Sequence, residues 1–379
     1  MWLTNFKNMS ILSTRNQPKM YYMYRGEDSV MDGFGARLKA ARKMAGMSQQ
    51  KLADATNLIT KQAVSKYEKG KMMPASDILI AISKALGVKP GYFYRQFQVK
   101  LTGLEFRKKS RLSKSDENRV KYQTLDFLER YMEIESIMGH PTVFVNPLKN
   151  VTIENQDDVE NAALRLRKAW ELGNAPVSNL MELMEDKGVR ILEVDLPDTF
   201  DGLSAWADNI PVITINKNSD LVRKRLTIVH ELAHLIIHFG ECSDRDLEKL
   251  CHSFASAFLL PKEKMIEEIG PNRTKISFLE LKKLKGIYGI SLMALIVRAK
   301  NLGIINEYSY RNFFIRATKS GWRSGKTKEP GEYVGREYAN RFRQLVSWAV
   351  AEDIITMSKG AELMYVSLPE FRKGFQIAA

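Results

Sequence analysis

Four of the five histidines in this 379-residue chain lie between positions 230 and 252. Two of them, His230 and His234, are four residues apart, and Glu231 directly follows the first. On a helix both imidazoles project from one face and can reach one metal ion, while Glu231 points toward a water bound beside it. The pattern is typical of a zinc hydrolase. The alternative is a buried helix whose histidines only satisfy hydrogen bonds, and the pattern also occurs by chance in unrelated proteins.

The residues around this motif favour the metal. The flanking positions between Leu226 and Ile237 are mostly apolar, so the helix would be buried on nearly all sides. A buried polar cluster is costly unless it is paired or coordinated. We therefore expect a helix that binds Zn²⁺ through His230 and His234, with Glu231 as the catalytic base.

A catalytic zinc needs a third protein ligand that still leaves one tetrahedral position open for water. His238 is a poor candidate, because eight residues along a helix place it ~12 Å from His230. Glu248 and His252 are better candidates, since they are four residues apart and share one face of a following helix. The residues alone leave both open.

Composition narrows the class of protein. Two cysteines exclude a disulfide scaffold, and Cys251 lies in an apolar run where a free cysteine usually acts as a small hydrophobe. No segment reaches the ~18 to 20 uninterrupted apolar residues of a membrane helix. Residues 1–32 lack a signal-peptide pattern and are expected to be a disordered extension. We expect a cytoplasmic protein that makes no membrane contact.

Charge is distributed unevenly along the chain. Residues 33–95 contain 12 Lys or Arg against 3 Asp or Glu, whereas residues 151–260 contain 11 against 19. A basic segment suits a polyanion, and an acidic segment suits a metal site. The asymmetry indicates a nucleic-acid-binding module fused to a second domain.

Residues 33–95 predict a compact helical domain. Helices are expected at residues 35–45, 49–55 and 61–67 and after Pro74, with Ser48 as the N-cap of the second. The second and third are spaced as a helix-turn-helix, which would place the third in the major groove of double-stranded DNA. A helical bundle for protein contact is the alternative. The side chains expected to face bases and phosphates are Gln49, Lys61, Gln62, Ser65 and Lys66.

The rest of the chain predicts a mainly α fold with one small sheet. Residues 96–150 are expected to be a linker whose long helix, at 117–138, is either a spacer or a dimer helix, so a homodimer stays open. Residues 151–305 predict an α+β domain, and residues 306–379 a helical tail. Within the α+β domain the expected strands are 189–194, 203–207 and 212–216, and the expected flanking helices are 159–170, 175–187, 278–285 and 292–301.

Two groups of segments resemble known families. Residues 48–53, Ser-Gln-Gln-Lys-Leu-Ala, and residues 61–74 resemble the Xre (Cro/CI-type) helix-turn-helix of phage repressors. Residues 201–206, 225–238 and 248–261 resemble ImmA/IrrE-type zinc metallopeptidases. The resemblances cover about residues 33–315, in the order found in bacterial regulators that fuse the two modules.

The second resemblance implies a ligand set and a reaction. The family pattern Glu-x-x-(Ala/Cys)-x-x-Phe-Ala places the third ligand on Glu248, whereas His252 stands where relatives frequently have asparagine, which leaves a supporting or substitute-ligand role open for it. Zinc held in this way lowers the pKa of its water toward ~7, and Glu231 takes the proton. The implied activity is cleavage of a repressor or antitoxin-like protein. The alternative is a non-catalytic transcription factor or antitoxin whose zinc domain senses a ligand or binds a partner.

Overall fold

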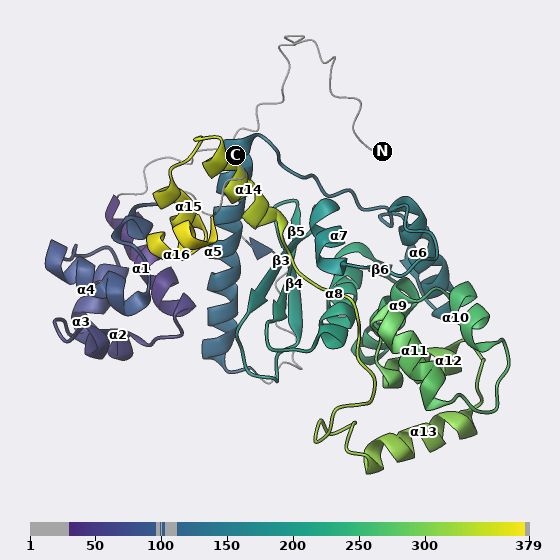
Figure 1. The fold of residues 1–379 in the computed structure, drawn as a ribbon. Coiled ribbons are helices and arrows are strands. Elements are labelled where there is room, and N and C mark those ends of the chain that lie inside the picture. Colours follow the sequence, from purple (N-terminus) through teal and green to yellow (C-terminus); the bar gives the residue numbers. More distant parts are fainter. Residues whose placement is uncertain (1–29, 96–98, 100, 103–111, 376–379) are drawn as a thin grey trace, which may run out of the picture.

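The computed structural model describes residues 30–95, 99, 101–102 and 112–375 (Figure 1). The extension expected at residues 1–32 lies outside the described residues, except for its last three, which are the first residues of α1 (Val30–Met44). The expected fold class, mainly helical with a small mixed sheet, is confirmed, and a separate two-stranded sheet is added to it. None of the helices in the described ranges is both long and apolar enough to span a membrane.

The N-terminal helices enclose a small core of their own. Residues such as Leu38, Leu52 and Val64 are fully buried there. Two helix starts are capped as short polar side chains predict: Ser48 accepts from the Lys51 amide at 3.1 Å, and Thr60 accepts from the Ala63 amide at 3.3 Å. After α1 this unit contains α2 (Gln49–Thr56), α3 (Lys61–Glu68), α4 (Ser76–Leu86) and the 3-10 helix η1 (Pro90–Tyr94).

The larger sheet has four strands in the order β1 (Leu101–Thr102), β4 (Gly202–Ala207), β5 (Ile210–Asn216) and β3 (Arg190–Val194). β4 is antiparallel to both of its neighbours, and β3 is parallel to β5. Successive side chains along each strand point to opposite faces of the sheet. Ile213 and Ile215 face the main hydrophobic core of the domain that contains this sheet, called the larger domain below. Val212 packs on the other face with residues of the long helix α5 (Lys114–Met138).

The motif helix α8 (Leu221–Ile236) covers the sheet face opposite α5. α8 also packs on α9 (Asp244–Leu259), and α9 packs on α6 (Gln156–Ala169). The remaining elements of this domain are α7 (Leu180–Asp186), α10 (Lys262–Ile269), α11 (Phe278–Tyr288), α12 (Leu292–Asn301), α13 (Glu307–Lys319) and a two-stranded parallel sheet of β2 (Thr152–Ile153) and β6 (His238–Phe239).

The long helix α5 is packed within the chain. The sequence left a spacer or a dimer helix open, but Leu128 packs against the sheet and Tyr131 packs against the C-terminal helices. Figure 1 shows α5 beside the sheet, with the C-terminal helices α14 (Arg341–Ala351), α15 (Met357–Leu363) and α16 (Leu368–Gly374) around its upper half. Because α5 has apolar contacts on two sides, its irregular stripe reflects two intramolecular partners rather than a coiled-coil seam.

Two ion pairs, one of them buried, join the N-terminal unit to α5 and to the C-terminal helices. Arg37 of α1 pairs with Glu129 of α5, with side chains 5% and 8% exposed. Arg95 pairs with Glu362 of α15 at 2.9 Å. Burial raises the pKa of Glu129, and the neighbouring Arg37 opposes this rise. The N-terminal unit therefore docks on α5 and on the C-terminal helices through charged contacts.

The segment between α13 and α14 crosses the larger domain and contacts the motif helix. Glu337 pairs with Arg225 of α8, and both side chains are fully buried. The ring of Tyr333 lies 4.7 Å from the Arg225 guanidinium. Gly289 leaves room for Arg225, since a Cβ there would lie 2.5 Å from its Nε. Burial raises the pKa of Glu337, although Arg225 opposes this.

Glu337→Gln is expected to lower the free energy of unfolding by about 3 to 5 kcal/mol, because it leaves the Arg225 charge buried without its counter-ion. Chemical denaturation measures this loss. Glu332→Gln is a matched control in the same segment, since Glu332 is exposed, and its effect should stay within about 0.5 kcal/mol. Equal stability of the two variants would contradict the prediction.

Candidate metal centre

Helix α8 presents two histidines to α9. Asp220 caps the helix by accepting from the Arg223 amide at 2.9 Å. Ile228 and Leu232 are fully buried in the core of the domain. With the apolar face fixed in this way, the helix turns His230 and His234 toward α9, and their side chains are only 10% and 8% exposed.

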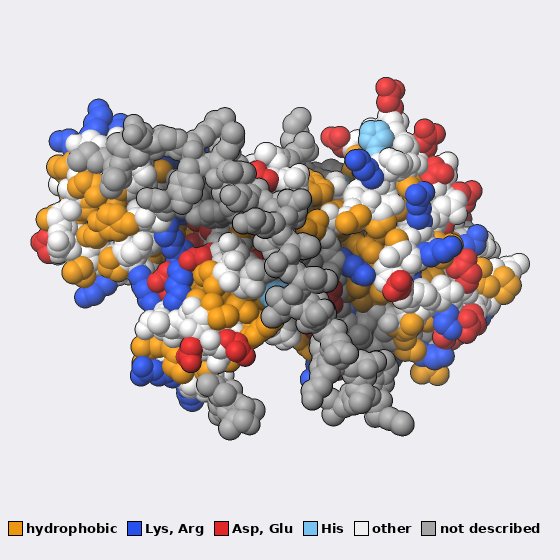
Figure 2. Space-filling view, turned by 90° about the horizontal axis from the view of Figure 1, so that it is seen from above, with side chains coloured by type: hydrophobic (Ala, Val, Ile, Leu, Met, Phe, Trp, Pro, Cys, Tyr) orange, Lys and Arg blue, Asp and Glu red, His pale blue; other side chains and the backbone are white. Residues whose placement is uncertain are grey.

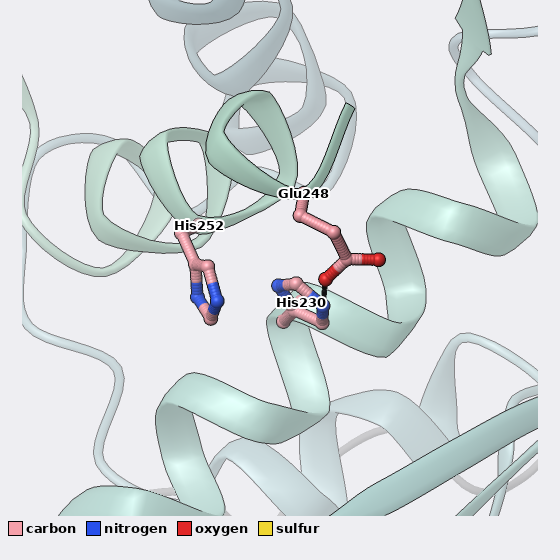
Figure 3. A group of neighbouring side chains, drawn as sticks. All are labelled: His230, Glu248 and His252. Carbon is pink, nitrogen blue, oxygen red and sulfur yellow. Dashed lines mark ion pairs between the residues drawn. The ribbon is translucent and has the colours of Figure 1, made fainter. Parts of the chain in front are cut away.

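Helix α9 supplies the facing groups. Its first turn is capped by Ser243, and its apolar side is anchored by buried Phe254 and Phe258. Figure 3 shows Glu248 and His252 projecting from this helix toward His230. The packing of α8 against α9 therefore brings side chains from both helices to one place.

Three donor groups lie close enough to share an ion. The two Nε2 atoms of His230 and His234 are 3.1 Å apart. Glu248 places one carboxylate oxygen 3.4 Å from Nε2 of His230 and the other 3.8 Å from Nε2 of His234. Four ligands tetrahedrally arranged at ~2.0 to 2.1 Å from zinc are separated by about 3.3 Å. Two imidazoles and a carboxylate at these separations fit Zn²⁺.

His252 belongs to the same cluster. Its ring centroid lies 4.2 Å from that of His230, with the ring planes tilted by 36°. One ligand atom from each of His230, Glu248 and His252 lies within 4.8 Å of the other two. His252 is exposed, whereas His230 is buried. The structure thus brings both candidates for the third ligand to the site.

Glu231 is oriented by the neighbouring strand. Ser204 of β4 donates a hydrogen bond to Oε2 of Glu231 at 2.7 Å. The close approach of β4 depends on Gly202, since a Cβ there would lie 2.6 Å from Cγ2 of Thr227 on α8. The sequence pattern did not indicate a role for Ser204. The residue was noted only as part of the segment from Asp201 to Trp206 that resembles the metallopeptidase family.

The two cysteines and His238 lie in different surroundings. Cys251 is fully buried, as its apolar setting predicted, but its Sγ also lies 3.3 Å from Nδ1 of His234, a contact that the sequence did not indicate. Cys242 is exposed. His238 is exposed in β6, where it pairs with Thr152. The structure does not bring His238 to the cluster.

The expected DNA-contacting side chains differ in exposure. Lys61, Gln62 and Lys66 are exposed on α3, and Ser65 is half-buried. Gln49 differs from the expected outward position: it is half-buried, and its amide donates to Glu68 at 2.8 Å. Three of the five side chains predicted to contact DNA thus lie on the exposed surface of α3.

Lys and Arg side chains occur over both ends of the face in Figure 2, whereas Asp and Glu side chains are more numerous at one end. Figure 2 shows Lys and Arg side chains at the outer left of the molecule, where α1 to α4 lie, and Asp and Glu side chains gathered at the upper right, over the larger domain. A basic surface on the helix-turn-helix side attracts a polyanion.

Comparison with known proteins identifies two domains. Residues 38–93 match the profile of a helix-turn-helix family, and residues 184–300 match the IrrE N-terminal-like domain of peptidase family M78. The chain therefore carries an Xre-type helix-turn-helix domain followed by an IrrE N-terminal-like domain.

Similar curated proteins match the N-terminal part. The SPbeta prophage-derived HTH-type transcriptional regulator YonR of Bacillus subtilis is 42% identical over 62 residues, which are 16% of this chain and 56% of that protein. The HTH-type transcriptional regulator y4wC of Sinorhizobium fredii is 40% identical over 70 residues, 18% of this chain and 48% of that protein. The chain thus spans about half the length of the curated relatives it matches.

Among solved structures, the apo form of the competence regulator ComR from Streptococcus vestibularis aligns with 91% of this chain and 98% of its own. The sequence identity is 13% and the TM-score is 0.17. A TM-score this low supports no conclusion about a shared fold.

Proposed function

We propose that the chain is a DNA-binding transcriptional regulator with zinc-dependent endopeptidase activity, which cleaves a repressor or antitoxin-like protein. The observation that carries the proposal is the convergence of His230, His234 and Glu248 beside Glu231. This arrangement combines a zinc-type donor set with a carboxylate in the position of a general base. The match to peptidase family M78 supports the same reaction class.

The residues of the site would have different roles in peptide hydrolysis. A bound zinc ion would supply Lewis acidity that makes a water acidic enough to lose a proton near neutral pH. Glu231 accepts that proton and later passes it to the leaving amine. Ser204 donates a hydrogen bond to Oε2 of Glu231 and so helps to orient its carboxylate. Cys251 contacts the ring nitrogen of His234 that faces away from Glu248 and so helps to fix the orientation of that imidazole.

Cleavage is tested by co-expressing the chain with each protein encoded beside its gene. Intact mass and fragment sequencing then identify a cut partner and the bond that is broken. Addition of a zinc chelator to the purified pair should stop the reaction, and restoring zinc should restart it. If no neighbour is cut while the chain still binds zinc, the enzymatic part of the proposal fails and the regulatory part stands.

The DNA-binding part rests on α3 and its exposed polar surface. On an operator selected from random duplexes, Gln62→Ala is expected to cost about 1 to 3 kcal/mol through loss of a base contact. Lys66→Ala should weaken binding to all sequences alike and reduce the salt slope by about 1, because it removes a phosphate contact. Titrations at several salt concentrations measure both effects.

Lys249→Ala is the matched control for this experiment. Lys249 is exposed on α9 in the other domain, so its removal changes the net charge equally without altering α3. Salt-independent binding, or equal effects of Lys66→Ala and Lys249→Ala, would instead favour a helical bundle for protein contact.

A second candidate is a regulator whose zinc domain senses a ligand or binds a partner without turnover. The observation that favours it is His252, which adds a further donor to a site that needs only three. The two candidates differ in whether a coordination position is open to water.

A further inference from the structure

The cluster contains one more ligand group than an open catalytic site requires. His230, His234 and Glu248 suffice to hold a tetrahedral ion with one position left for water. His252 comes from the same face of α9 as Glu248, one helical turn further along. Figure 3 shows both side chains converging on His230. The question is therefore what His252 does in a site that is already complete without it.

Burial indicates which coordination position His252 would take. The side chains of His230 and His234 are 10% and 8% exposed, and that of Glu248 is 21% exposed. His252 is exposed. The other three ligands are all less exposed than His252, so we assign the open coordination position to the side of His252, where water and substrate can enter. An imidazole there competes directly with the reacting water.

Chemistry and geometry both permit this coordination. Imidazole is a common zinc ligand, and His252 offers one more such donor at the cluster. The ligand atoms of His252, His230 and Glu248 lie within 4.8 Å of one another, compared with about 3.3 Å between ligands around one zinc ion. The exposed side chain of His252 can cover this difference by a rotamer change.

We propose that His252 is a fourth, displaceable protein ligand that closes the resting zinc site. The inference rests on the proposed function, because it concerns the same ion. It adds regulation: the peptidase is closed until a substrate or partner draws His252 away and opens the position for water. It also reconciles an intact general base with a complete set of protein ligands.

The first test counts imidazoles in the unmodified protein. X-ray absorption of the zinc-loaded full chain is expected to show three imidazole nitrogens and one oxygen in the first shell. Two imidazoles and two oxygens would overturn the proposal while leaving the proposed function intact. A chain that binds no zinc would overturn both. Because the measurement needs no variant, it does not depend on how a substitution folds.

The second test uses His252→Asn, with His252→Ala as a further variant and His238→Asn as the matched control. Asparagine is polar but lacks the imidazole, and His238 is an exposed histidine outside the cluster. Competition with a chromophoric chelator is expected to show zinc affinity lowered at least ~10-fold by either change at position 252 and unaltered by the control. The imidazole count should fall from three to two.

The visible spectrum of the Co²⁺-loaded protein gives an independent readout, since replacement of an imidazole by water alters the ligand field. Unchanged affinity and an unchanged spectrum in both variants would overturn the proposal. Where a cleaved partner is known, His252→Asn should cut it faster than the unmodified chain. A slower cut with no change in zinc affinity would likewise contradict a closing role.

Discussion

Glu231→Gln is expected to abolish detectable cleavage of the protein partner while zinc content, fold and DNA binding stay unchanged. Glutamine preserves the shape of the side chain and can still accept the hydrogen bond from Ser204, but it cannot take a proton. A general base contributes roughly 10² to 10⁴-fold to the rate, and here it also generates the nucleophile. Initial rates of cleavage, with zinc content measured on the same preparations, test this expectation.

Glu241→Gln is the matched control, because Glu241 is an exposed carboxylate between α8 and α9 outside the cluster. The Glu241→Gln variant should cleave the partner at the same rate as the unmodified chain. Cleavage by Glu231→Gln at a comparable rate would remove Glu231 from the mechanism. If no neighbouring protein is cut and Glu231→Gln regulates its promoter as the unmodified chain does, the zinc domain is better described as a sensor or partner-binding module.

Local structure was predictable because its signals are local. Ser48 caps α2, as expected of a short polar residue directly before a helix. The three strands before α8 appear within two residues of their predicted starts, since β-branched runs bounded by turn residues indicate strands from a few neighbouring positions. The spacing of His230 and His234 likewise fixed their shared face before any packing was known.

Tertiary partners were not predictable in the same way. Arg95 and Glu362 pair across 267 positions, and nothing in either local sequence indicates the other. The interpretation of α5 as a spacer or a dimer helix failed to anticipate two intramolecular partners, because an irregular apolar stripe does not identify what covers it. Domain docking depends on such distant pairs.

The residues of the candidate metal site were also only partly predictable from the sequence. Helix geometry placed Glu248 and His252 on one face, but only the packing of α8 against α9 brings that face to His230. The contacts of Ser204 with Glu231 and of Cys251 with His234 join separate elements and left no periodic signal. Residues that support a ligand or a base from another element therefore became visible only in the fold.

The double change His230→Ala and His234→Ala is expected to reduce bound zinc from about one ion per chain to near zero after dialysis. It removes two of the three donors that an open site needs, and one carboxylate with an exposed imidazole is a weak site for zinc. Metal analysis of the dialysed protein measures the loss. Stabilisation by zinc should disappear as well, since an ion at a thousandfold its Kd contributes about 4 kcal/mol to the folded state.

His238→Ala separates ligand loss from a general effect of removing histidine on this segment. His238 is only four residues beyond His234, yet it is exposed in β6 and lies outside the cluster, so this variant should keep its zinc and its zinc-dependent stability. Stoichiometric metal in the double variant would show that the ion is held elsewhere. Loss of metal in His238→Ala alone would contradict the placement of the site between α8 and α9, because β6 would then have to supply a ligand.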